Sequence, residues 1–292
     1  MTCFRFGLAV GANAPFAVLE RRWRIAEEFG FDNLWVSDHT ASFASGGTGY
    51  CYDGWVILAA MACRTSTIRI GTLVSNPVLR APAILAKQAL AVDDLSGGRL
   101  ELGIGTGIAE FDYDAVGEPY WSARERGERL AEYVRIVASI LESPEPVTAG
   151  GPFYSVRTSR SPEAVQRPRP PITIGGQAPQ VIEVAARHAD RWNTHGPAGA
   201  DVDEILNRSR RQTAVIDDLA RSHGRDPKAI TRALMGVQAL DVWNRDISVG
   251  EIVERFSPLG FSEFVFGWPG EDRIDEIERV AADVLPSLRQ EA

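Results

Sequence analysis

The 292-residue sequence has little lysine and an excess of acid. Lysine occurs only at Lys87 and Lys228, so arginine carries nearly all of the positive charge, and 39 acidic against 31 basic residues leave a net charge of −8. A chain with this balance is a poor candidate for sequence-independent binding to a phosphate backbone. We therefore expect no nucleic-acid partner.

Cysteines and long apolar runs are also scarce. Cys3, Cys51 and Cys63 form no CxxC motif and no Cys/His pair at metal-ligand spacing, which favours free thiols in a reducing compartment over a metal site. No stretch approaches the roughly 18 apolar residues that a membrane span needs, and the N-terminus lacks the regions of a signal peptide. These absences predict a cytoplasmic protein with neither a metal nor a membrane partner.

The sequence does contain a regular alternation of apolar, strand-like runs and amphipathic, helical stretches. The expected strands are 4–10, 32–38, 68–75, 100–105, 171–176, 191–196, 232–241 and 262–268. The expected helices are 15–29, 53–64, a stretch from Pro82, 122–142, a stretch from Pro179, 203–222, 248–256 and 272–288. Proline suits the first turn of a helix, which supports the two starts at proline.

Eight strands, each followed by a helix, predict a single α/β domain over residues 1–292, folded as a (β/α)8 TIM barrel. Alternation alone would also allow an open sheet, but the count of eight and the chain length favour the barrel. The least regular stretch, 143–171, is rich in proline, glycine and serine. It is expected to form a long loop before strand five, with a short hairpin near 149–156.

Polar or glycine-rich residues follow at least five of these strands. The relevant endings are "SDH" (37–39), "VSNP" (74–77), "GTG" (105–107), "GG" (175–176) and "NTH" (193–195). In parallel barrels the chemistry collects at the C-terminal ends of the strands, which meet at one rim. We therefore expect one site at that rim.

These endings lie in longer segments, "GFDNLWVSDH", "RIGTLVSNPVLRAPAILAKQALAVDDLSGGRLELGIGTG" and "RPPITIGGQAP" with "AARHADRWNT". In these segments the chain resembles the luciferase-like flavin-dependent monooxygenase superfamily, and more narrowly its branch that uses the deazaflavin coenzyme F420. The resemblance covers most of the chain, and "LSGGRLELG" followed by "GTG" is its most specific part. It also implies a (β/α)8 barrel.

Histidine titrates near neutral pH and can give or take a proton at a reacting atom. The resemblance implies that His39 faces the reactive ring of the flavin, and Asp38 beside it is expected to assist, so both are candidate catalytic residues. The residues alone allow another interpretation, in which Asp38 caps the following turn and His39 packs against Trp35 or Phe43.

The resemblance implies cofactor contacts from Leu73, Val74, Ser75, Asn76, Thr106, Gly107, Gly175, Gly176, Gln177 and Thr194. It further implies a cis peptide bond between Leu73 and Val74, where the residues alone allow an ordinary strand end. The glycine pair precedes a helix whose first N–H groups favour an anion, so Gly175, Gly176 and Gln177 are expected to hold the cofactor's phosphate.

The chain departs from the deazaflavin branch directly after "GTG". Related enzymes carry an acidic catalytic residue there, whereas this chain has Ile108, with Glu110 two residues later. The departure argues against dehydrogenation of a sugar phosphate. Glu110, Trp268 and His195 are the candidate residues of the substrate pocket, and Trp121 and Trp243 are further candidates.

The resemblance implies an F420-dependent oxidoreductase that transfers a hydride between the deazaflavin and a small organic substrate, working as a homodimer. Two alternatives keep the same fold. One is a monooxygenase that uses reduced FMN and oxygen, and the other is a flavin-binding protein without activity. Four arginines in the long loop would suit the polyglutamate tail of F420, or form a solvated face: Arg157, Arg160, Arg167 and Arg169.

Overall fold

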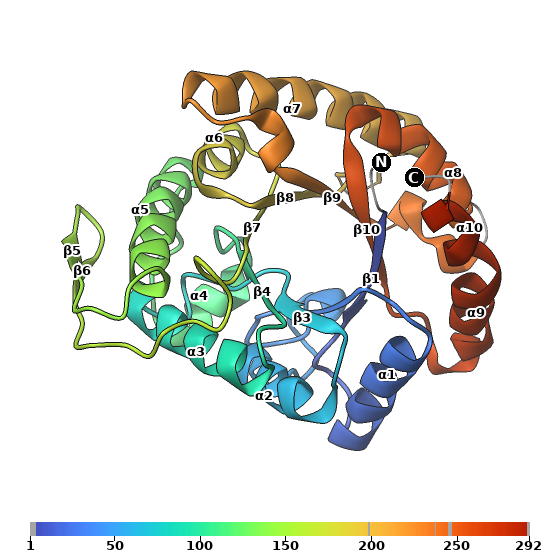
Figure 1. Ribbon diagram of the computed structural model, residues 1–292, viewed down its shortest axis with the longest axis horizontal. Helices are drawn as coiled ribbons and strands as arrows, with labels where there is room; N and C mark the ends of the chain where they lie inside the picture. Colours follow the sequence, from blue (N-terminus) through green and yellow to red (C-terminus); the bar gives the residue numbers. More distant parts are fainter. Residues whose placement is uncertain (1–3, 198, 237, 245–246, 291–292) are drawn as a thin grey trace.

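The computed structural model describes residues 4–197, 199–236, 238–244 and 247–290. Within them, eight parallel strands close into a barrel in the order β1-β10-β9-β8-β7-β4-β3-β2, and helices surround the barrel (Figure 1). This arrangement confirms the predicted (β/α)8 barrel. The C-terminal ends of all eight strands therefore face one side of the molecule.

The barrel strands are β1 (Arg5–Val10), β2 (Asn33–Val36), β3 (Arg69–Thr72), β4 (Leu100–Ile104), β7 (Ile172–Gly175), β8 (Arg191–Thr194), β9 (Thr231–Gly236) and β10 (Phe261–Gly267). The α-helices are α1 (Phe16–Glu28), α2 (Gly54–Arg64), α3 (Pro82–Leu95), α4 (Glu110–Val116), α5 (Ala123–Leu141), α6 (Pro179–His188), α7 (Val202–Ser222), α8 (Val249–Phe256), α9 (Ile274–Arg279) and α10 (Leu285–Gln290). Short 3-10 helices lie at Phe43–Ser45, Pro227–Ala229, Gln238–Leu240, Val242–Asn244, Ser257–Leu259 and Glu271–Arg273.

The expected hairpin of the long loop is present. Strands β5 (Thr148–Gly150) and β6 (Ser155–Arg157) pair antiparallel, and Figure 1 shows them outside α5, away from the barrel. The buried Glu132 carboxylate of α5 accepts the N–H groups of Phe153 and Tyr154 at 3.2 and 2.9 Å. A buried charge with two hydrogen bonds ties the hairpin to this helix.

Several expected boundaries were wrong. The strand expected at 232–241 ends at Gly236, and a 3-10 helix follows; residue 237 lies outside the described residues. A Cβ on Gly236 would lie 2.8 Å from the Leu240 carbonyl oxygen, so the chain folds back over the strand end. Helix α4 was not expected, and the last helix is interrupted by a π-helical turn, Val280–Val284.

The lower part of the barrel interior, at the N-terminal ends of the strands, holds a network of ion pairs. Arg191 Nη1 lies 2.9 Å from Glu101 Oε2, and Arg191 Nε lies 2.9 Å from Glu263 Oε2. The second contact is an ion pair whose atoms are not aligned for a hydrogen bond. Arg5 contacts both carboxylates, and Arg69 Nε contacts Glu101 at 2.6 Å. The two glutamates are fully buried, so these arginines supply the charge that burial requires.

A layer of aromatic packing lies above the ion pairs. The Trp35 indole donates to Asn33 Oδ1 at 2.7 Å, and the Arg191 guanidinium lies 5.6 Å from the Trp35 ring centroid. A Cβ on Gly71 would approach the Trp35 ring to 2.6 Å, so glycine in β3 makes room for it. Trp35, Trp55 and Trp192 are all buried, as expected of core residues.

Acid should destabilise the protein through Glu101. Burial would raise the pKa of this carboxyl, but Arg191, Arg5 and Arg69 lower it from 4.5 to about 2. A depressed carboxyl pKa stabilises the fold above the unfolded-state pKa, and this contribution is lost as the pH falls through the folded-state pKa. We expect a loss of about 3 kcal/mol in unfolding free energy between pH 4.5 and pH 2.

Urea unfolding of the wild type and of Glu101→Gln at several pH values would measure this loss. Glutamine does not titrate, so the variant should be less stable at neutral pH and show a flatter dependence of stability on pH over the same range. Equal pH slopes for the two proteins would contradict the assignment to Glu101.

Candidate active site

His39 follows β2 at the C-terminal end of the barrel, and its closest polar partner is Asp112 on α4. His39 Nδ1 lies 2.7 Å from Asp112 Oδ2, while the imidazole packs against Phe43 and Phe111 with ring centroids 5.1 and 5.7 Å apart. An imidazole whose Nδ1 faces a carboxylate carries its proton there and leaves Nε2 as an acceptor. His39 Nε2 has no partner among the described residues.

Asp112 is the centre of a small polar cluster. Its Oδ1 accepts from the backbone N–H and the hydroxyl of Thr40, both at 2.8 Å, and its Oδ2 accepts from Asn76 Nδ2 at 2.8 Å as well as facing His39. Burial would raise the pKa of the Asp112 carboxyl, but hydrogen bonds from His39 and Thr40 outweigh burial and hold it below its usual range. The buried carboxylate is therefore charged and fixed, which orients His39.

Asp38 does not assist His39 directly, contrary to expectation. Its carboxylate accepts from the Asn76 backbone N–H at 2.9 Å and forms a two-pronged ion pair with Arg80, with Nη2 at 3.0 Å from Oδ1. Asp38 is buried and the Arg80 side chain is 7 % exposed. A bidentate buried pair of this kind fixes the loop after β3, so Asp38 has a positioning role.

The peptide bond between Leu73 and Val74 is cis, as the resemblance implied. The Val74 side chain then lies across the glycines at the ends of β4 and β7. A Cβ on Gly105 would lie 2.4 Å from Val74 Cγ2, and a Cβ on Gly175 would lie 2.8 Å from Val74 Cγ1. Glycine at these two strand ends therefore makes room for the Val74 side chain.

The neighbouring candidates divide into rim and core residues. Ser75 is buried and bonds the Trp55 indole at 3.2 Å, so its hydroxyl belongs to the core. Thr106 and Gly107 are partly exposed at the rim. Gly107 has φ +70°, which glycine adopts readily, and a Cβ there would lie 2.6 Å from Asn76 Oδ1. The turn therefore also packs against the cluster around Asp112.

The start of α6 offers hydrogen-bond donors for an anion, but Gly176 is not one of them. The Gly176 N–H donates to the Asn193 carbonyl oxygen at 3.1 Å, so it is not free for a phosphate. In the described parts of the chain, the N–H groups of Gln177, Ala178 and Gln180 have no acceptor. Free N–H groups at the N-terminus of this ten-residue helix favour an anion, but they begin at Gln177 and not at the glycine pair that was expected to hold it.

The two candidates at the end of β8 point in different directions. Thr194 is buried and its hydroxyl lies 3.4 Å from Gln212 Oε1 of α7, so it does not line the site. His195 is exposed at the rim, with Nδ1 at 2.6 Å from the Gly196 carbonyl oxygen and 3.0 Å from Gln177 Nε2. The carbonyl requires a proton on Nδ1, so the contact with Gln177 Nε2 is not a hydrogen bond in that tautomer.

The candidate residues of the substrate pocket lie in different places. Glu110 and Ile108 are exposed beside the rim, whereas Trp121 and Trp243 are buried and pack within the protein. Trp268 follows β10, is partly exposed, and lies beneath the Arg22 guanidinium at 5.6 Å. Of these, Ile108 and Glu110 belong to the same side of the mouth as His39, through α4.

Two residues that matter at the site were not among the candidates. Asp112 lies 73 positions from His39, in a helix that was not expected. Asn193 was noted only as part of a strand end, yet it is buried and its Nδ2 has no hydrogen-bond partner among the described residues. A buried amide donor without a partner is available to a polar group of a ligand.

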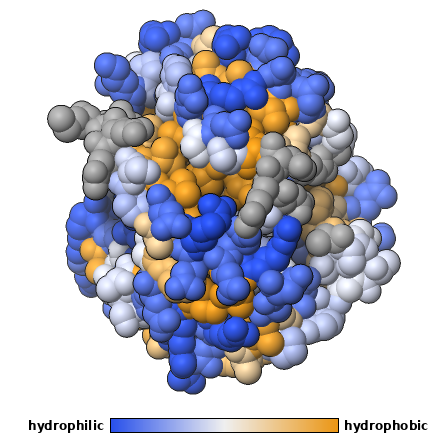
Figure 2. Space-filling view, turned by 90° about the vertical axis from the view of Figure 1, so that its right-hand side faces the viewer, coloured by the Kyte–Doolittle hydropathy of each residue, from blue (hydrophilic) through white to orange (hydrophobic). Residues whose placement is uncertain are grey.

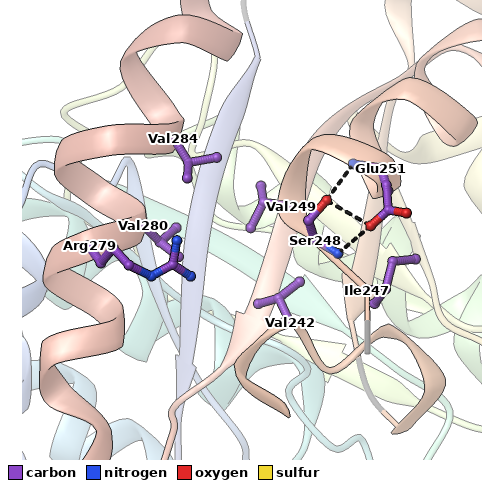
Figure 3. A pocket seen from close by; sticks show the side chains of 8 residues that line it. All are labelled: Val242, Ile247, Ser248, Val249, Glu251, Arg279, Val280 and Val284. Atoms are coloured by element: carbon purple, nitrogen blue, oxygen red, sulfur yellow. Dashed lines mark hydrogen bonds between the residues drawn. The ribbon is translucent and has the colours of Figure 1, made fainter. Parts of the chain in front are cut away.

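A separate hollow of about 330 Å³ lies outside the barrel, between α8 and the C-terminal helices (Figure 3). Figure 2 shows this face, where hydrophobic side chains gather between hydrophilic ones. The polar groups in the hollow are already paired, since Ser248 and Glu251 bond each other in a capping box at the start of α8. This hollow therefore offers no convergent chemistry.

Fold and site together define a parallel-barrel protein with a histidine–carboxylate pair and glycine-lined strand ends at its C-terminal mouth. Residues 1–241 match the family described as luciferase-like monooxygenase, and the chain belongs to this family. The family prediction is thus confirmed.

Two curated relatives and one solved structure illustrate the similarity. The chain is 30% identical to the F420-dependent glucose-6-phosphate dehydrogenase of Intrasporangium calvum, over 90% of this chain and 92% of the relative. It is 26% identical to the 5,10-methylenetetrahydromethanopterin reductase of Methanolobus tindarius, over 91% of this chain and 75% of the relative. The fold matches that of an F420-dependent secondary alcohol dehydrogenase in complex with an F420-acetone adduct, with a TM-score of 0.78, 18% identity and coverage of 98% and 99%.

In the described residues, no helix is long and apolar enough to cross a bilayer. The same residues contain no group of three or more His, Cys, Asp or Glu side chains that could hold a metal ion.

Proposed function

We propose that the protein is an F420-dependent oxidoreductase that transfers a hydride between the deazaflavin and a small organic substrate. The observation that carries the proposal is His39 held at Nδ1 by the buried Asp112, at the same rim of the barrel as Gly105 and Gly175, over which Val74 packs. The relative from Intrasporangium calvum supports F420 over other cofactors, because it is named an F420-dependent glucose-6-phosphate dehydrogenase and is 30% identical over 90% of this chain.

The residues present fit such a cofactor. Gly105 and Gly175, with Val74 across them, would hold the flat ring, and Asn193 Nδ2 would donate to one of its polar atoms. The free N–H groups at the start of α6 would hold the phosphate. When bound, the deazaflavin supplies the hydride chemistry, and the protein supplies orientation and a proton position at His39 Nε2.

Anaerobic titration of the purified protein with F420 and with FMN tests the proposal. We expect F420 to bind and to be reduced or oxidised by at least one member of a panel of alcohols and carbonyl compounds. Preferential binding of FMN with oxygen-dependent turnover would favour the monooxygenase alternative. F420 binding without turnover across the panel would favour a non-catalytic binding protein.

Gly105→Ala should weaken cofactor binding by more than about tenfold, because the added methyl group must displace Val74 from the ring site. Gly267→Ala, at the last residue of β10, is the matched control, since a Cβ there meets no atom within 4 Å. Fluorescence titration with F420 compares the two variants. The double variant Gly105→Ala/Val74→Ala should regain part of the affinity, whereas equal affinities of both single variants and the wild type would argue against a ring beside Val74.

We also propose that the protein is a cytoplasmic homodimer joined through α2 and α3. Val56 on α2 and Ile84 on α3 are large apolar side chains that are 66% and 50% exposed. Sedimentation velocity of the wild type and of Val56→Glu/Ile84→Glu tests this association. A wild type that sediments as a monomer at micromolar concentration would exclude it.

A further inference from the structure

The surface around His39 is apolar. Phe43 and Ile108 are 53% and 56% exposed, although both are large hydrophobic residues. Phe111 completes the group, with its ring centroid 6.4 Å from that of Phe43 and 5.7 Å from the His39 imidazole. Exposed apolar side chains that gather around a candidate acid–base residue, rather than scattering over the surface, indicate a binding surface.

Hydrogen bonds and close contacts hold both flanks of this surface in place. On one side, Ser42 and Gly49 form a bridge, and Gly47, with φ +85°, packs so closely on Phe111 that a Cβ would lie 2.6 Å from its ring. On the other side, the Tyr120 hydroxyl donates to the Ile108 carbonyl oxygen at 3.1 Å. The apolar surface is therefore part of the fold rather than of a loose loop.

The charges near His39 are unfavourable for an anion. Asp38 and Asp112 are buried carboxylates behind it, and Glu110 is exposed beside Ile108. Among the described residues, the guanidinium bonded to this cluster belongs to Arg80, which is 7 % exposed and paired with Asp38 and Asp53, whereas Arg126 lies over the Tyr120 ring at 4.9 Å and donates to the Trp121 carbonyl oxygen. A phosphate or carboxylate on the substrate would meet apolar carbon and negative charge here.

We propose that the substrate is a neutral, predominantly apolar molecule that carries one hydroxyl or carbonyl group. An alcohol hydroxyl donates to His39 Nε2, a carbonyl oxygen accepts from Nε2–H when this nitrogen carries the proton, and the hydrocarbon part lies against Phe43, Ile108 and Phe111. This inference rests on the proposed function, because it concerns the same site. It gives a physical meaning to Ile108, which stands where the related enzymes carry an acid.

The test uses the full chain loaded with oxidised F420, to which ketones bind without being turned over. The probes are cyclohexanone, 4-methylcyclohexanone and 4-oxocyclohexanecarboxylate, and the readout is the dissociation constant from the change in F420 fluorescence. The added methyl group should tighten binding by about threefold to fourfold. The carboxylate should weaken binding by at least about tenfold, because burying an unpaired charge is costly.

Variants at the apolar surface should reverse this preference. Phe43→Arg is expected to weaken the binding of 4-methylcyclohexanone and to tighten the binding of 4-oxocyclohexanecarboxylate. Ile108→Arg should have the same two effects. Val215→Arg is the control, since Val215 is 45% exposed on α7, outside the site. It should leave all three constants unchanged.

The outcomes separate this inference from the proposed function. A protein that does not bind F420 defeats the proposed function before any ketone is added. A protein that binds F420 but shows no preference for the neutral ketones over the carboxylate, including one that binds none of the three, overturns the substrate assignment alone.

Discussion

Asp112→Asn should lower kcat about 100-fold while the protein still folds and binds its cofactor. Asparagine keeps the shape and the hydrogen bond from Thr40 but removes the negative charge 2.7 Å from His39 Nδ1. His39 then loses the charged group that fixes its orientation. Acid–base catalysis by a positioned side chain contributes about 10² to 10⁴ in rate, so a partial loss of this size follows.

A conservative variant distinguishes this role from a merely structural one. Asp112→Glu restores a carboxylate at this position, so it should regain part of the kcat that Asp112→Asn loses, while the affinity for F420 stays close to that of the wild type in both variants. Asp114→Asn, two positions further along α4 and exposed, is the control and should leave kcat unchanged. An Asp112→Asn enzyme with wild-type kcat would exclude the positioning role.

The barrel could be predicted from the sequence because its signal is repeated. Each strand is a short apolar run followed by an amphipathic stretch, and one wrong boundary does not change the count. The boundaries failed where tertiary contacts decide them. The strand after Thr231 ends early because the chain turns back over Gly236, and apolar residues such as Leu240, which suggested a longer strand, are buried by that turn instead.

The site was only partly readable for a related reason. His39, Val74 and Gly105 lie at strand ends, so their common rim follows from the fold. Asp112 lies in a short helix whose sequence, "EFDYDAV", contains two other exposed acidic residues, and no spacing marks the buried one. An N–H group can bind an anion only if it does not already donate to another residue. The Gly176 N–H donates to the Asn193 carbonyl oxygen because of the register between β7 and β8, which the sequence does not reveal.

Asp38 shows how adjacency in sequence misleads at a strand end. Successive residues of a strand point to opposite sides. Asp38 and His39 are neighbours in the chain, but the carboxylate of Asp38 turns to Arg80 and the imidazole of His39 turns to Asp112. Asn76 joins the two pairs, with its N–H on Asp38 and its side chain on Asp112. The candidate catalytic histidine is thus supported by residues from two strand ends, those of β2 and β3, and from one helix, α4.

Arg191→Met should destabilise the protein by about 3 to 5 kcal/mol, because it leaves two buried carboxylates without their shared partner. Arg191 contacts Glu101 and Glu263 at 2.9 Å each and also Thr173 Oγ1 at 3.1 Å. The loss should affect Glu263 more than Glu101. Burial and the negative charge of Glu101 raise the pKa of the Glu263 carboxyl, and the attraction of Arg191 offsets only part of this, so the charged form of Glu263 is already costly.

Urea unfolding at neutral pH measures the effect, with Arg187→Met as the control. Arg187 is 54% exposed and pairs with Glu183 one helical turn away at 3.4 Å, so its loss should cost less than about 1 kcal/mol. Adding Glu263→Gln to Arg191→Met should recover part of the stability, since the second change removes a charge that the first left unpaired. If Arg191→Met costs no more than Arg187→Met, the ion pairs beneath Trp35 do not stabilise the barrel, and its apolar packing alone must hold the strands that carry the site.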